Sequence, residues 1–229
     1  MSKKKSDLWT HWAMAMVVMV IICTMSWSDT FTVTSTDDSG PGSLREAIES
    51  ANANAGLDLI AFNIPGPGPH TIQPIPLPPL EPYPILALPM ITDPVIIDGY
   101  TQPGAASATH SSPATLLIEI DGIHAIDDYW VNGLSIAAGS CTIRGLVINH
   151  FGDCGIRIHE NGGNTIQGNY LGTDPAGTEA RPNHDSGIGI GTSGNLIGGT
   201  TPAARNVLSG NGACGIGVGG TGNTVLGNY

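Results

Sequence analysis

Short apolar runs alternate with polar and glycine-rich turns along the second half of the chain, and they return at regular intervals. The strings GIRI, GIGI and GIGV begin at Gly155, Gly187 and Gly215, while NTIQG, NLIGG and NTVLG begin at Asn164, Asn195 and Asn223. A third apolar run, NVLSGN at 206–211, lies within one repeat. Three short strands in every 28 to 32 residues predict an all-β fold, a parallel β-helix whose successive coils stack on one another.

Stacking places equivalent residues of successive repeats in one column. Ile143, Ile166, Ile197 and Val225 are expected to form an interior column, because β-branched side chains pack well on a pleated surface.

A second column is expected at a corner of the coil. It contains Cys141, Asn164, Asn195 and Asn223. Stacked Asn side chains can hydrogen-bond one another and the backbone groups that a bend leaves unpaired. The recurring Asn is therefore interpreted as part of a corner that is built again on every coil.

The first part of the chain has a different pattern. Alternation over 30–35 predicts a strand, and Ser43 followed by Glu46 has the spacing of a helix capping box. Apolar residues at helical spacing follow, and Gly56 is expected to end the helix. One short amphipathic helix is thus predicted within a cap region at 29–66.

Further strands are predicted at 57–66, 95–100 and 116–122. The Pro-rich segment at 70–94 is predicted to be an extended surface insert, because Pro cannot donate to a central ladder. Coils are expected over 95–229. Since the sequence ends within a repeat, we expect further coils in a longer protein.

Residues 1–28 are interpreted as a secretory signal peptide. Three lysines precede a thirteen-residue apolar run at 13–25, and small residues follow it. A membrane anchor is the alternative, but the run is shorter than the ~20 residues that span a bilayer. A secreted or cell-surface location and no transmembrane span after cleavage are therefore expected.

Removal of this segment would leave 5 basic and 18 acidic residues, a net charge of −13. Such a surface repels nucleic acids, anionic membranes and acidic polysaccharides that no cation bridges. The cysteines are expected to be small packing residues without disulfides. Cys154 and Cys214 fall two coils apart, roughly 9.6 Å, which is beyond disulfide range.

Several longer strings carry a resemblance. GSLREAIESANANAG, TDPVIIDGYTQPG, CTIRGLVINHFGDCGIRI, GNYLGTDPAGTEA and GGTTPAARNVLSGNG resemble secreted bacterial right-handed parallel β-helix repeat proteins, which often carry a Cys-Ser-Leu-Arg-Glu-Ala segment. Gly42 stands where that Cys is usual. The resemblance covers about 30–229 without the Pro-rich segment. It implies a right-handed helix whose open end is capped by 43–54, and relatives that are surface proteins or act on polysaccharides.

Catalysis on polysaccharides would need clustered groups on one outer face. In GIRI, Arg157 and His159 point outward, but Gly189 and Gly217 occupy the position of Arg157 in the next coils. The weak catalytic candidates are Asp153, Glu160, Asp185 and Arg157. Asp153 and Asp185 precede equivalent strands and are expected to be neighbours, although solvated turn residues are the simpler interpretation.

The weak binding candidates are Asp127, Asp128, Trp130 and His159. Asp127 and Asp128 with Trp130 would offer carboxylates beside a sugar-stacking ring, whereas a solvated loop with a core Trp is the simpler interpretation. No Cys/His spacing indicates zinc, no metal is assigned, and Ca²⁺ is a candidate cofactor only.

Two functional hypotheses follow. The first is a secreted or cell-surface β-helix module with a structural, adhesive or carbohydrate-binding role, whose partner is a polysaccharide or a cell-surface component. No convincing catalytic constellation supports an enzyme. The alternative, by analogy of fold, is a polysaccharide lyase or glycoside hydrolase of the pectin-degrading type that acts through turn carboxylates, with Ca²⁺ as a candidate cofactor.

Overall fold

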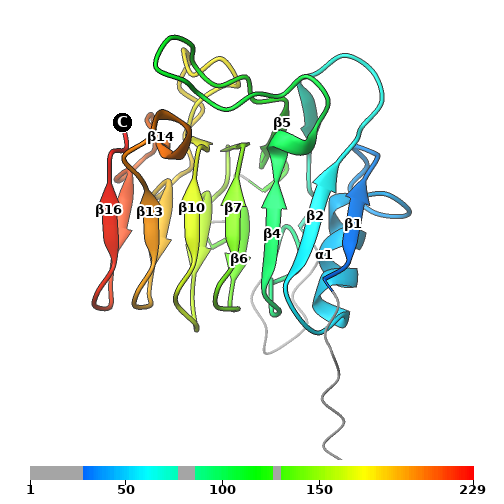
Figure 1. Cartoon of the computed structure of the whole chain (residues 1–229), viewed down its shortest axis with the longest axis horizontal. Helices are drawn as coiled ribbons and strands as arrows, with labels where there is room; N and C mark the ends of the chain where they lie inside the picture. Colours follow the sequence, from blue (N-terminus) through cyan, green and yellow to red (C-terminus); the bar gives the residue numbers. More distant parts are fainter. Residues whose placement is uncertain (1–27, 77–85, 126–129) are drawn as a thin grey trace, which may run out of the picture.

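The computed structural model describes residues 28–76, 86–125 and 130–229. These residues form a right-handed parallel β-helix with a helix at one end (Figure 1). The signal-peptide prediction falls almost entirely outside the described residues. Within them, no helix has the length and apolar character needed to cross a bilayer.

The described elements alternate short strands with turns. The strands are β1 (Thr30–Val33), β2 (Asp58–Phe62), β3 (His70–Ile72), β4 (Val95–Asp98), β5 (Ile118–Asp121), β6 (Leu134–Ile136), β7 (Thr142–Arg144), β8 (Leu146–Asn149), β9 (Ile156–Ile158), β10 (Thr165–Gln167), β11 (Tyr170–Leu171), β12 (Ile188–Ile190), β13 (Leu196–Gly198), β14 (Val207–Leu208), β15 (Ile216–Val218) and β16 (Thr224–Leu226). The helices are α1 (Leu44–Ala53) and the 3-10 turns η1 (Gly99–Thr101) and η2 (Pro202–Ala204).

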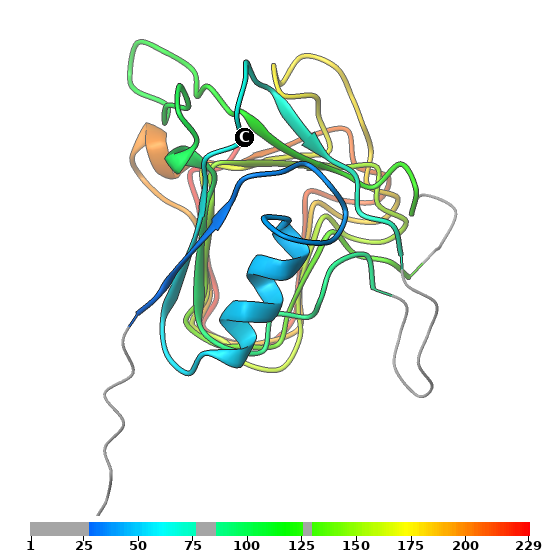
Figure 2. The ribbon, with the colours of Figure 1, turned by 90° about the vertical axis from the view of Figure 1, so that its right-hand side faces the viewer.

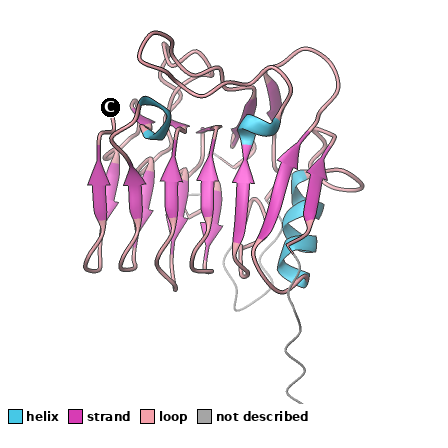
Figure 3. Ribbon diagram, viewed as in Figure 1, coloured by secondary structure: helices cyan, strands magenta, loops and turns pink. Residues whose placement is uncertain are grey.

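Three parallel sheets form the faces of the coil (Figure 3). Sheet A has the order β1-β2-β4-β7-β10-β13-β16, sheet B the order β3-β5-β8-β11-β14, and sheet C the order β6-β9-β12-β15. Each full coil therefore contributes one strand to each sheet, as the repeat predicted.

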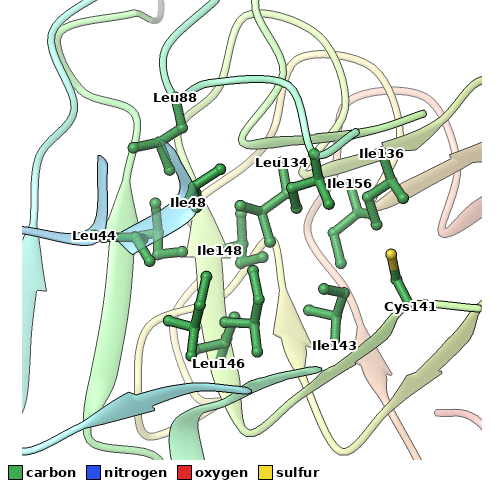
Figure 4. Close-up of a cluster of buried hydrophobic side chains, with 14 of the residues drawn as sticks. Leu44, Ile48, Leu88, Leu134, Ile136, Cys141, Ile143, Leu146, Ile148 and Ile156 are labelled. Carbon is green, nitrogen blue, oxygen red and sulfur yellow. The ribbon is translucent and has the colours of Figure 1, made fainter. Parts of the chain in front are cut away.

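The predicted interior column is confirmed. Ile166 pairs with Ile143 on one side and with Ile197 on the other, and Ile197 pairs with Val225. The three isoleucines are fully buried, while Val225, on the last strand, is 46% exposed. Ile143 packs within the same core as side chains from sheets B and C (Figure 4).

The predicted Asn corner is also confirmed, and its hydrogen bonds explain the repeat. The side-chain oxygen of Asn164 accepts from the N–H of Cys141 at 2.9 Å. The oxygen of Asn195 accepts from both the N–H and the side-chain amide of Asn164, and Asn223 accepts from Asn195 in the same way. Each Asn thus satisfies the buried corner of the preceding coil.

The two other corners have Asn ladders that the sequence analysis did not predict. Between sheets A and B, Asn206 accepts from the N–H and side-chain amide of Asn169, and Asn228 accepts from Asn206. Between sheets B and C, the side-chain amide of Asn183 donates to Asn211 at 3.0 Å. All three corners therefore use the same device.

Helix α1 lies across the end of the coil, as the resemblance implied (Figure 2). Its buried Leu44 and Ile48 join the core (Figure 4). Ser43 caps the helix by accepting from the N–H of Glu46, but Glu46 accepts from Gly42 rather than from Ser43. The predicted capping box therefore forms only the first of its two hydrogen bonds. The second was expected from the N–H of Ser43 to the side chain of Glu46, but this N–H donates to the backbone oxygen of Gly40. The helix ends at Ala53, before the predicted stop.

The predicted surface insert at 70–94 is wrong at both of its ends. Strand β3 pairs with β5 in sheet B, while Leu88 and Ile91 are buried and the N–H of Ile91 donates to Ser135. Most prolines of the segment lie between β3 and Leu88. The residues that pair with neighbouring strands, such as His70 and Ile91, are not prolines and therefore keep the backbone N–H groups that sheet pairing needs. The coils consequently begin at β2 rather than at residue 95; residues 77–85 lie outside the described residues.

Candidate functional site

The outer face of sheet C carries few side chains. Ser135 pairs with Arg157, Arg157 with Gly189, and Gly189 with Gly217. The flanking Leu and Ile residues are in the core, so these four positions face outward. The predicted stacking of two glycines beside Arg157 is confirmed.

A cavity of about 410 Å³ lies against this face, and we call it the sheet C cavity. The segment at 86–90, the residues before β6 and the turns before β9 and β12 contribute to its walls. It is lined by Leu86, Met90, Trp130, Asn132, Ser135, Asp153, Arg157, His159 and Asp185. Five candidates from the sequence analysis, Asp153, Asp185, Arg157, His159 and Trp130, therefore share one site.

The two aspartates are neighbours, as predicted from the repeat. The N–H of Asp185 donates to the backbone oxygen of Asp153 at 3.1 Å. The buried thiol of Cys154 lies between the side chains, with Sγ 3.6 Å from Oδ1 of Asp153 and 3.6 Å from Oδ2 of Asp185. One ligand atom from each residue lies within 4.8 Å of the other two.

The chemistry of this group is set by burial and charge. Burial, and then the negative charge of Asp153, raises the pKa of the Cys154 thiol to about 12. At the other end of β9, burial and then the positive charge of Arg157 lower the pKa of His159. The cavity thus combines two carboxylates, a guanidinium and an imidazole that favours its neutral form, and the buried thiol of Cys154 lies beside the two carboxylates.

Gly189 leaves the room that Arg157 occupies. A Cβ on Gly189 would lie 2.9 Å from both Nη1 of Arg157 and Sγ of Cys154. The glycine at this position therefore lets the guanidinium extend along the outer face beside the thiol.

Trp130 lies at the cavity with 80% of its surface exposed, so its interpretation as a core residue is wrong. Val131 takes the buried position instead. Glu160 is exposed and does not line the cavity, while Asp127 and Asp128 lie outside the described residues.

Ser135 was not among the predicted site residues, although the string GLSI at 133–136 has the same pattern as GIRI. Ser135 is 4% exposed, and its Oγ has no hydrogen-bond partner among the described residues. The Nε2 atom of His159, which also lines the cavity, is likewise buried without a hydrogen-bond partner among the described residues. Buried polar atoms without partners are rare and call for an explanation; a ligand in the cavity would supply one.

The cysteines of the described residues are free, as predicted, but Cys214 is exposed rather than packed.

Iodoacetamide at pH 8 is expected to modify Cys214 first in the native protein. Burial raises the pKa of Cys141 to about 11 and that of Cys154 to about 12, so both buried thiols are far less ionised at this pH than an ordinary thiol. Peptide mass spectrometry before and after denaturation measures this, and equal labelling of Cys154 and Cys214 would contradict it.

A second cavity, of about 370 Å³, lies under the segment at 108–114. It is lined by aromatic rings including Tyr100 and Tyr170, and by Arg205, but by no carboxylate. The sheet C cavity is larger and gathers more chemically distinct groups, so it is the stronger candidate.

No protein-family model matches this chain, and no curated protein is significantly similar to it. The geometry of the sheet C cavity is therefore the basis for assigning a function to this chain.

Proposed function

We propose that this chain is a secreted or cell-surface β-helix module that binds carbohydrate in the sheet C cavity. The main support is Trp130, which is 80% exposed at a cavity that also contains carboxylate, guanidinium and imidazole groups. A large exposed ring beside convergent polar groups is typical of a binding site.

Sugars suit this combination of surfaces. The flat face of an indole packs against the apolar C–H face of a sugar ring. The carboxylates of Asp153 and Asp185 accept hydrogen bonds from hydroxyl groups, and Arg157 donates them. The acidic surface expected after signal removal disfavours polyanions, so neutral glycans are the expected ligands.

Replacing Trp130 with Ala is expected to weaken glycan binding at least about 10-fold, because a buried aromatic contact is a common source of binding energy. A glycan array would identify the ligand, and titration calorimetry would measure its affinity for each variant. Leu57→Ala is the matched control, since Leu57 is also an exposed apolar residue, but lies at the β2 end of the coil. Failure of every glycan to bind, or equal affinity of Trp130→Ala and the native chain, would refute the proposal.

A second candidate function is polysaccharide cleavage. It is favoured by the convergence of Asp153, Asp185 and Arg157 on one cavity. The same samples can be assayed for chain cleavage of plant and algal polysaccharides, with and without Ca²⁺. Turnover that is lost in Asp185→Ala would assign catalysis, whereas binding without turnover would assign a binding module.

A further inference from the structure

We propose that Asp153, Cys154 and Asp185 bind a transition-metal ion, with Zn²⁺ as the best fit, at the edge of the sheet C cavity. This inference goes beyond carbohydrate binding and does not depend on it. The residues are not recognisable as a metal motif in the sequence, since Asp185 lies one coil away from Asp153 and Cys154. Stacking of the coils brings the three side chains together.

The distances between the ligand atoms fit a tetrahedral site. Zn–S and Zn–O bonds of about 2.3 Å and 2.0–2.2 Å place sulfur and oxygen about 3.5–3.7 Å apart at the tetrahedral angle. The sulfur of Cys154 lies 3.6 Å from an oxygen of each aspartate. Both sulfur–oxygen distances therefore match the required spacing before any ion binds, and the two carboxylate oxygens lie within 4.8 Å of each other.

A thiol alone explains this arrangement poorly. It has one proton and can donate to one carboxylate oxygen at a time. The other carboxylate then faces a sulfur lone pair, an unfavourable contact in a partly buried site. A cation between the sulfur and both oxygens removes this conflict.

The charges of the site support the same conclusion. None of the ion pairs of the described residues involves Asp153 or Asp185. With two carboxylates, one thiolate and a divalent cation, the occupied site would carry a net charge of −1. The guanidinium of Arg157, which approaches the same glycine as the sulfur does, supplies the compensating positive charge.

An independent observation points to a ligand in this cavity. Ser135 is 4% exposed, its Oγ has no partner among the described residues, and its register beside Arg157 directs it into the sheet C cavity. Three protein ligands are also the number found in zinc sites that bind a water molecule or substrate in addition.

The presence of sulfur distinguishes this site from the Ca²⁺ site considered in the sequence analysis. Ca²⁺ prefers six to eight oxygen ligands, and thiolate ligands select softer metals. We therefore expect Zn²⁺ and Co²⁺ to bind and Ca²⁺ to bind far more weakly.

Cobalt provides the sharpest test. Chelator-treated protein titrated with Co²⁺ is expected to develop a near-ultraviolet sulfur-to-cobalt charge-transfer band that Zn²⁺ abolishes, with one ion bound per chain. Cys154→Ser is expected to lose the band and to weaken Zn²⁺ binding at least about 100-fold, the upper end of what loss of an outer-shell partner costs. Cys141→Ser and Cys214→Ser are the matched controls and should keep both.

Asp185→Asn provides a second variant that keeps the thiol and nearly the same volume, and it should also weaken Zn²⁺ binding at least about 10-fold. Circular dichroism checks the fold of each variant. Absence of the band in the native chain, its persistence in Cys154→Ser, its loss in Cys214→Ser, or Ca²⁺ binding as tight as Zn²⁺ binding would overturn the proposal. Glycan binding is measured separately, so failure of either proposal leaves the other testable.

Discussion

Replacing Asn206 with Ala is expected to lower the free energy of unfolding by about 4 kcal/mol. Asn206 is fully buried at the corner between sheets A and B. Its side-chain oxygen accepts from the N–H and the side-chain amide of Asn169 at 3.0 and 3.1 Å. The Ala variant leaves both donors buried without an acceptor, and each such loss costs about 1–3 kcal/mol.

Thermal unfolding followed by circular dichroism measures this effect, and about 4 kcal/mol corresponds to a fall in Tm of about 8–16 °C for a chain of this size. Asn161→Ala is the matched control. Asn161 is exposed, and its side chain donates one hydrogen bond, to the backbone oxygen of Ala137, so the loss of this bond should cost about 1 kcal/mol or less. If the two variants were equally stable, the ladders would not be the device that holds the corners.

The Asn ladders also show which corners of the coil can be predicted from the sequence. The corner before sheet A was predictable, because Asn164, Asn195 and Asn223 each begin a similar string. Asn169 and Asn206 escaped the same reasoning because their spacing of 37 residues is lengthened by the excursion between β11 and β12. Asn183 and Asn211 keep a spacing of 28 residues, but they lie in the dissimilar strings PNHDSG and SGNGAC, so no repeated string marked them.

The first coil was missed for a related reason. The prolines after Ile72 suggested an insert, but a strand needs its N–H groups only where it pairs, and β3 ends before the prolines begin. The composition of a whole segment therefore misled where the positions of its individual prolines did not.

The candidate site likewise combines residues that the repeat predicted with residues that it could not predict. The proximity of Asp153 and Asp185 followed from their equivalent places in successive coils. The exposure of Trp130 and the cavity wall at 86–90 did not, because they depend on contacts between segments outside the repeat. A repeat predicts what stacks within the coils, whereas irregular segments decide which part of the outer surface becomes a cavity.

The interior column yields the second large effect, since Ile166→Ala is expected to destabilise the protein by about 4 kcal/mol. Ile166 is fully buried between Ile143 and Ile197, and coils a strand spacing apart cannot close the cavity that the shorter side chain leaves. Thr165→Ala, an outward position on the same strand, should cost less than about 0.5 kcal/mol.

Because each coil contacts only its neighbours, hydrogen exchange in the Ile166→Ala variant should rise most in β7, β10 and β13 and least near α1. Uniform exchange along the whole coil would instead indicate that the β-helix unfolds as one unit.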